Sequence, residues 1–209
     1  MRPSWREARS VAVGMTGTLD QFVSHADVRE RHEALVAAPA RLTFDVAENF
    51  ELDSLPIVRT LFWLRAKLLG ARYEAWHRGL LGEMEQIGWQ KLAYTPGREL
   101  VMGAAAQPWV GDVKFRAIPP ETFAVFDEPG LVKIAWTLEA EPVGPALTRF
   151  ATETRVIATD EDARKRFRAY WRKFGLGILL IRWVAVPAVK REAERRYKMA
   201  PTPSDPRTV

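Results

Sequence analysis

Histidine is scarce in this sequence, and His32 is the histidine best placed for chemistry. It alternates with Ala34 and Val36 on one face of a predicted strand, which turns it inward, where an imidazole can act as acid or base near neutral pH. The simpler interpretation is a core or rim histidine with a satisfied hydrogen bond. His25 and His77 have no acidic or histidine partner at metal-ligand spacing, so we expect no metal and no cofactor.

A second chemical group is ionic. Glu153 and Arg155 lie two residues apart on one face of a predicted strand, with Glu139 opposite them on the neighbouring strand. On the outer face of the sheet they would form an ion-pair ladder in which each pair contributes about 0.2–1 kcal/mol. A register shifted by one residue would instead turn them inward as polar anchors. Glu153 and Arg155 therefore join His32 as candidate catalytic residues.

Strands that position these groups are marked by a two-residue alternation of apolar side chains. The Pro96-Gly97 pair predicts the turn of a hairpin, because proline fixes its own φ and glycine accepts a positive one. Trp136 is central to the clearest alternating segment, which we expect to pair with the last one. The predicted strands cover residues 27–38, 89–94, 98–107, 113–118, 132–139 and 149–156.

Helical spacing of apolar residues marks the remaining segments. Two helices are predicted directly after the first strand, a connecting helix follows them, and one helical turn falls near Phe126. The longest apolar stripe predicts a C-terminal helix capped by Thr159 or Asp160, with bends at glycine and proline. These helices cover residues 39–50, 56–70, 71–88, 119–126 and 160–196, and the bends are expected at Gly175, Gly177 and Pro187.

The chain resembles the START-like, polyketide-cyclase/dehydrase superfamily (SRPBCC) through five short segments in a characteristic order. These segments are residues 27–32 (DVRERH), 36–39 (VAAP), 96–101 (PGRELV), 126–130 (FDEPG) and 152–156 (TETRV). The resemblance spans residues 19–196 and carries no catalytic signature. It implies an α+β helix-grip fold, in which a curved antiparallel sheet wraps around a long C-terminal helix and two helices follow the first strand.

The resemblance also implies a cavity between sheet and helix for a lipid, a polyketide or an aromatic metabolite. Candidate lining residues are those on the inward-facing side of the predicted strands and on the apolar side of the predicted helices. For each of them, packing in the core is the alternative role. They are Phe62, Met102, Trp136, Thr152, Thr154, Tyr170 and Phe174. Our leading interpretation is a noncatalytic carrier or sensor of a hydrophobic small molecule. The alternative in the same cavity is a lyase of the polyketide cyclase/dehydratase kind.

Composition limits the other functional classes. Apolar residues make up 47% and charged residues 27% of the 209 residues, as in one soluble globular domain. There is no cysteine, which excludes thiolate chemistry and fits the cytoplasm. No phosphate loop, nucleophile elbow, zinc-protease helix or dinucleotide fingerprint is present, which disfavours nucleotide chemistry. Residues 175–189 are apolar but contain Arg182 and Pro187, so we expect a buried helix rather than a membrane span.

The net charge of +5 is concentrated near the C-terminus, with 12 basic residues between Arg164 and Lys198. This excess is typical of the solvated face of a long helix, so we expect no nucleic-acid partner. A third interpretation is an interaction module, whose basic helix contacts an acidic partner or the membrane periphery. We expect a single domain over residues 19–198, a poorly ordered extension over residues 1–18 with Met15 as an alternative start, and a tail over residues 199–209.

Overall fold

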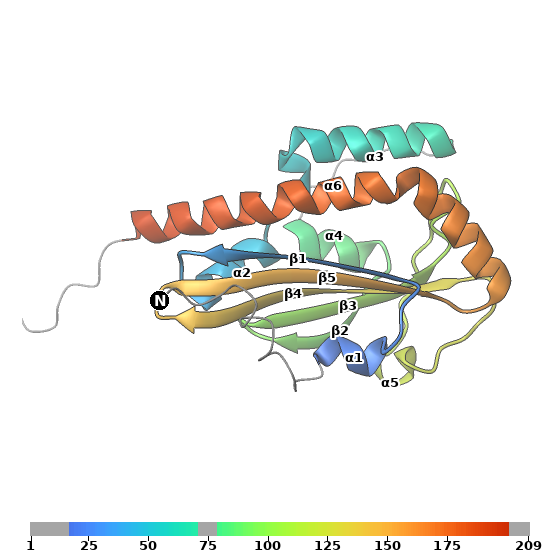
Figure 1. Ribbon diagram of the computed structural model, residues 1–209, viewed down its shortest axis with the longest axis horizontal. Coiled ribbons are helices and arrows are strands. Elements are labelled where there is room, and N and C mark those ends of the chain that lie inside the picture. The colour runs from blue at the N-terminus through green and yellow to red at the C-terminus, as the bar shows by residue number, and fades with distance from the viewer. Residues whose placement is uncertain (1–16, 71–78, 201–209) are drawn as a thin grey trace, which may run out of the picture.

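The computed structural model describes residues 17–70 and 79–200, which form an α+β fold (Figure 1). Its elements, in chain order, are α1 (Thr18–Phe22), β1 (Val28–Val36), α2 (Ala40–Glu48), the 3-10 turn η2 (Leu52–Ser54), α3 (Pro56–Leu69), α4 (Gly79–Gln86), β2 (Gln90–Thr95), β3 (Glu99–Ala106), α5 (Pro120–Phe123), β4 (Val132–Gly144), β5 (Leu147–Ala158) and α6 (Glu161–Met199).

The five strands form one antiparallel sheet in the order β1-β5-β4-β3-β2. Thr154 pairs with Glu30 on one side and with Trp136 on the other, and Trp136 pairs in turn with Met102. Paired residues of antiparallel neighbours point to the same side of the sheet. These four side chains therefore share one face, which we call the inner face, and the residues that alternate with them lie on the outer face.

The long helix α6 covers the inner face (Figure 1). It begins after Asp160, whose carboxylate accepts a hydrogen bond from the Ala163 backbone N–H at 2.8 Å, as expected for an N-cap. The helix changes direction in its first half and then runs along the sheet. Val186 and Val189 belong to the same core cluster as Trp136. The predicted helix-grip fold is thus confirmed.

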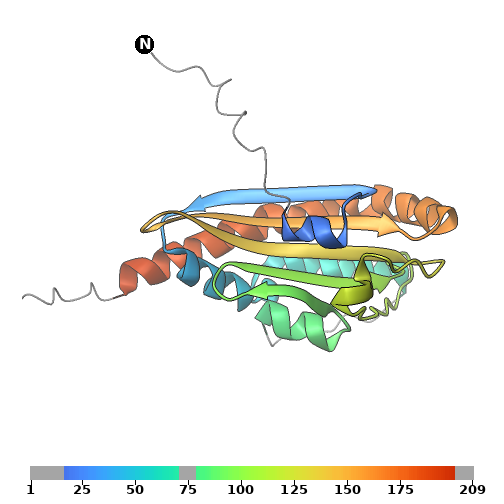
Figure 2. The same cartoon turned by 90° about the horizontal axis from the view of Figure 1, so that it is seen from below.

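The outer face is covered at its centre by the short helices α1 and α5, which Figure 2 shows in front of the sheet, with α6 behind it. Leu19 of α1 and Phe123 of α5 form a second core cluster with Val101 and Ala135 of the strands. Gly103 allows the close approach, since a Cβ atom there would lie 2.6 Å from Phe123 Cε2. The sheet is therefore buried on both sides at its centre.

Two helices after the first strand are present as predicted. Helix α2 contacts β4, β5 and α6, and α3 lies along α6 on the side away from the sheet. Gly70 ends α3 in the left-handed conformation with φ 70°. The hairpin is also as expected, since Gly97 has φ 73° in the turn between β2 and β3.

Two local expectations are wrong. Residues 113–118 form no regular strand, because only the Ala105–Arg116 bridge joins them to the sheet. Residues 175–189 are not a buried helix, since Leu176 is 80% and Trp183 69% exposed. The reason is that α6 lies on the surface of the fold, with one face toward the sheet and the other toward solvent.

Parts of other expectations lie outside the described residues. Helix α1 begins at Thr18, while residues 1–16, including Met15, lie outside, as do residues 201–209 of the predicted tail. Of the predicted connecting helix at residues 71–88, α4 occupies the second half, and residues 71–78 with His77 are not described. Within residues 17–70 and 79–200, no helix combines the length and hydropathy needed to cross a membrane.

Candidate functional site

A cavity of about 810 Å³ lies between one end of the inner face, helix α6 and helix α3. The sheet contributes Ile134, Thr154 and Val156 to its wall, and most of the other wall residues are apolar. The apolar part also includes Phe62, Ala66, Met84, Trp89, Val113, Phe115, Phe167, Trp171, Ile178 and Leu179. A volume of this size is in the ordinary range for small-molecule sites, about 300–1,000 Å³.

Arg182 is a partly buried cation in this wall. Its Nη1 donates to the Glu30 backbone oxygen at 3.1 Å, and its Nη2 donates to the Thr154 hydroxyl. Burial disfavours the charged guanidinium and lowers the pKa of Arg182 to about 10, although Glu30 and Glu153 partly offset this effect. The side chain is therefore a charge held in an apolar environment.

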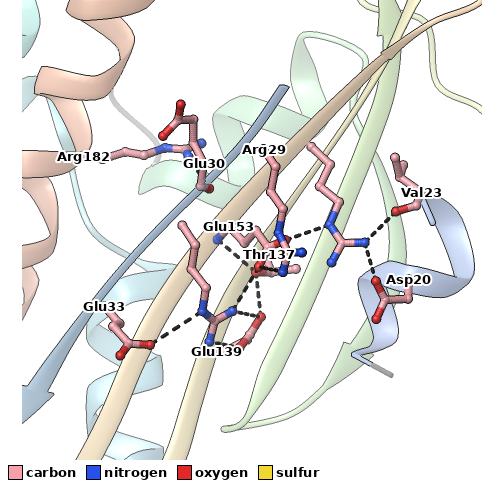
Figure 3. Close-up of polar contacts among 11 residues, drawn as sticks. Asp20, Val23, Arg29, Glu30, Glu33, Thr137, Glu139, Glu153 and Arg182 are labelled. Carbon is pink, nitrogen blue, oxygen red and sulfur yellow. Dashed lines mark hydrogen bonds and ion pairs between the residues drawn. The ribbon is translucent and has the colours of Figure 1, made fainter. Parts of the chain in front are cut away.

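In the part of the chain that the structure describes, the Arg182 guanidinium has hydrogen-bond acceptors but no carboxylate in direct contact. The Glu30 side chain also belongs to the cavity wall and lies near Arg182, as Figure 3 shows. Among the described residues, however, no carboxylate forms an ion pair with Arg182. A guanidinium offers five N–H donors, of which these two bonds use two. Since buried charges in proteins are normally paired, Arg182 is the clearest candidate for contacting a ligand.

A second arginine enters the cavity from α3. Arg65 Nε donates to the Tyr170 hydroxyl at 3.2 Å, and Nη2 donates to the Pro108 backbone oxygen at 3.1 Å. The Arg65 guanidinium carbon also lies 5.9 Å from the centre of the Tyr170 ring, within the range of a cation–π contact. Arg65 is thus positioned through Tyr170, a residue of α6. This hydrogen bond links α3 to α6 in the polar part of the cavity wall.

The predicted lining residues divide into two groups. Phe62, Thr154 and Tyr170 are in the cavity wall. Met102 and Trp136 are instead packed into the central core cluster, where Met84 and Trp89 are also buried. Thr152, on β5, and Phe174, which packs beside Tyr170 with ring centres 5.0 Å apart, also lie outside the wall. The cavity therefore occupies one end of the inner face and not its centre.

His32 lies on the inner face, paired with Thr152, but it is not part of the cavity wall. Its Nε2 atom is buried and has no hydrogen-bond partner within residues 17–70 and 79–200. Burial lowers the pKa of His32, and the positive charge of Arg182 lowers it further. Both effects favour the neutral imidazole, and the side chain of His32 does not line the cavity.

Glu153 and Arg155 alternate with Thr154 on β5 and therefore lie on the outer face, opposite the cavity wall. Figure 3 shows Glu153 among its polar neighbours. The shifted register that would turn them inward does not occur, so neither can contact a cavity ligand. The expected ladder is nevertheless more than a surface feature. Glu153 is only 2% and Arg155 only 5% exposed.

The outer-face network is centred on Glu153. Its carboxylate accepts hydrogen bonds from Arg155 Nε at 2.7 Å and from Arg31 Nη1 at 3.3 Å, and it pairs with Arg29 Nε at 2.8 Å. Burial by itself would raise the pKa of Glu153, but the bonds from Arg155 and Arg29 outweigh this effect and hold it below its ordinary value. Glu139 extends the network, since Arg31 Nη2 donates to it at 3.0 Å.

Arg155 connects this network to the N-terminal helix. Its Nη1 donates to the Asp20 carboxylate and, at 2.6 Å, to the Val23 backbone oxygen. The pKa of Arg155 is raised because hydrogen bonds to Glu153 and Asp20 outweigh the opposing effect of burial. Removing one partner of such a buried pair costs about 3–5 kcal/mol. Arg155 therefore holds α1 on the sheet, and Glu153 pairs with Arg155.

Comparisons with known proteins leave the family open. No protein-family model matches the sequence, and no curated protein matches it. Among solved structures, the chain is similar to the ZhuI aromatase/cyclase from Streptomyces sp. R1128, at 15% sequence identity and a TM-score of 0.28, over 81% of this chain and 94% of that chain. A likeness this distant carries no argument about activity. The fold assignment rests on the sheet order and on α6, and superfamily membership stays a prediction.

Sequence reasoning missed Arg182, Arg65 and Glu30 as site residues. A signal for Arg182 is present, since it continues the four-residue spacing from Ile178 to Val186 and is the one charge in that stripe. For Arg65 and Glu30 no comparable signal exists, because both are ordinary charged residues of amphipathic elements. Among the residues that the structure describes, no group of three or more histidine and acidic side chains is placed to hold a metal ion.

Proposed function

We propose that this protein binds an amphipathic small molecule, with its apolar part among the aromatic and aliphatic wall residues and a polar head group at Arg182. The head group is an anion or a strong hydrogen-bond acceptor, such as a carboxylate, an enolate or a ketone oxygen. The observation that carries the proposal is the buried Arg182 guanidinium in the wall of the 810 Å³ cavity, without an ion-pair partner among the described residues.

Arg65 and Tyr170 support the same assignment. Their hydrogen bond places a second guanidinium and a hydroxyl in the cavity wall, at the junction of α3 and α6. Both groups can donate to a ligand oxygen, and charge-assisted hydrogen bonds are about twice as strong as neutral ones. Glu30 and Asp112 add negative charge to the wall, so the site suits a ligand with one acidic or carbonyl group better than a polyanion. We propose a carrier or sensor role for this site.

Glu30 favours a second candidate function in the same cavity. Its carboxylate is in the wall beside Arg182, the arrangement that an enolisation requires. Glu30 would accept the proton from a carbon next to a ketone, and Arg182 would stabilise the resulting enolate oxygen. Such a step begins the ring closures and dehydrations of polyketide cyclases. Under this alternative Glu30 and Tyr170 are the acid–base residues, whereas His32, Glu153 and Arg155 have no direct role.

Native mass spectrometry of the purified protein tests the binding proposal. We expect a population with added mass that an organic solvent releases as an apolar or amphipathic compound, and a smaller population in the Arg182→Met variant. The Arg172→Met variant, which removes an exposed arginine of the same helix, should retain the wild-type amount. Equal loading of all three proteins would refute a head-group site at Arg182. Loss of turnover of a ketone substrate in Glu30→Gln, with binding retained, would favour the enzyme.

A further inference from the structure

Exposed apolar side chains gather on two neighbouring helices, α3 and α6. Large apolar residues are normally scattered singly over a soluble surface, and a group of them marks an interaction site. On α6 they follow a spacing of four and three residues, which places them on one side of the helix. The group, which we call the helical patch, comprises Ile57, Trp63, Leu64 and Leu68 of α3 with Leu176, Leu180 and Trp183 of α6.

The two rows of the helical patch lie close together. Helix α3 runs along α6 on the side away from the sheet (Figure 1). The helices approach closely at Gly177, where a Cβ atom would lie 3.6 Å from Leu61 Cδ2. Leu176 directly precedes Gly177, and Leu64 lies one helical turn from Leu61. The patch is therefore a surface shared by two packed helices.

Charge identifies the kind of partner. Neither Pro56–Leu69 nor residues 163–191 contain an acidic residue, so the cations near the patch have no acidic neighbour in their own helix over these stretches. Arg59, Lys67, Arg172 and Lys173 are exposed there. Lys67 Nζ lies 5.0 Å from the centre of the Trp63 ring. Tryptophan and leucine flanked by lysine and arginine are the composition of helices that lie in the interface of an anionic bilayer.

We propose that the helical patch docks on the surface of an anionic lipid bilayer, with its leucine and tryptophan side chains at the headgroup boundary and its cations at lipid phosphates. A second copy of this chain fits less well, because patch-to-patch contact would bring like charges together. Phe62 and Ile178, on these same two helices, belong to the cavity wall, so the docked face adjoins the cavity. The docking surface does not depend on what the cavity binds.

Vesicle flotation with the full chain tests this proposal. We expect binding to vesicles of equal parts phosphatidylcholine and phosphatidylglycerol, and little binding to pure phosphatidylcholine. Raising the ionic strength from about 0.1 M to about 0.5 M should weaken binding by about tenfold or more, since screening reduces the attraction of each cation. Trp183→Ser should weaken binding by about tenfold, because an interfacial tryptophan is lost. Arg172→Glu should act in the same direction.

Matched controls are available on other parts of the surface. Val125→Ser removes an exposed apolar side chain outside the patch, and Arg98→Glu reverses an exposed charge in the β2–β3 turn. Both should bind vesicles like the wild type.

The proposal is overturned if binding does not depend on lipid charge, or if the controls lose as much binding as Trp183→Ser. Self-association that Trp183→Ser abolishes, without vesicle binding by the wild type, would show a second copy as the occupant instead. A failure here leaves the ligand measurements at Arg182 unaffected.

Discussion

Replacing Arg182 by methionine should make the ligand-free protein more stable while weakening ligand binding. The guanidinium is buried enough that its pKa falls to about 10. A depression of this size corresponds to about 3 kcal/mol of unfavourable free energy for the charged form. Methionine has a similar length and no charge, so Arg182→Met removes this cost and keeps an apolar side chain in the cavity wall.

The gain is reduced by two lost hydrogen bonds, those to the Glu30 backbone oxygen and the Thr154 hydroxyl. Each contributes about 1 kcal/mol, and Thr154 can be rehydrated because it lines the cavity. The net expectation for Arg182→Met is an increase of about 1 kcal/mol in the free energy of unfolding. For a chain of this size the increase raises Tm by about 2–4 °C.

Urea denaturation and thermal unfolding of ligand-free protein measure this change, with Arg172→Met as the control, expected within about 0.5 kcal/mol of the wild type. Destabilisation of Arg182→Met by more than about 2 kcal/mol would refute the reasoning, because it would make Arg182 a structural residue whose hydrogen bonds hold α6 on the sheet.

Three further changes test other parts of the structure. Glu153→Gln should lower the free energy of unfolding by about 3–5 kcal/mol at neutral pH. Because the folded-state pKa of Glu153 is lowered, its contribution to stability is present above the ordinary carboxyl range and is lost as the pH falls through the folded-state pKa. Urea denaturation curves of wild type and variant should therefore converge in acid. Gly103→Ala should lower the free energy of unfolding by about 1–3 kcal/mol, since its Cβ atom would lie 2.5 Å from Leu92 Cδ1. Gly177→Ala, a helical position with room for a Cβ atom, should raise it by up to about 1 kcal/mol. Thermal unfolding of both variants measures these changes. Ala66→Phe should fill part of the cavity and reduce the ligand-bound fraction in native mass spectra; an unchanged fraction would mean that the ligand binds elsewhere.

The architecture was predictable wherever local chemistry determines it. Asp160 caps α6, Gly97 turns the hairpin, and alternation around Trp136 marks β4, because each pattern depends on neighbours along the chain. Burial of the Glu153–Arg155 pair was not predictable in the same way. It depends on segments far away in the sequence, since Arg155 contacts Asp20 of the five-residue helix α1 and Glu153 contacts Arg29 and Arg31 of β1.

The position of the cavity is another feature that strand parity cannot supply. Parity places Met102, Trp136 and Thr154 correctly on one face, but it does not say which part of that face other side chains fill. Met84 and Trp89 pack into the same cluster as Met102 and Trp136, which fills the centre of the inner face. The open volume therefore lies further along the strands, toward Ile134 and Val156, next to α3 and α6.

The central claim is that Arg182 binds the head group of an amphipathic ligand, and a pair of probes tests it most directly. Decanoic acid and decan-1-ol have the same chain and differ in the charge of the head. Calorimetric titration should show the wild type binding the acid about tenfold to a hundredfold more tightly, as expected for a charge-assisted hydrogen bond of about 1.5–3 kcal/mol. Arg182→Met should lose most of this preference, with only the part that Arg65 supplies remaining. Equal affinity of the wild type for the two probes, or binding of neither, would contradict the account.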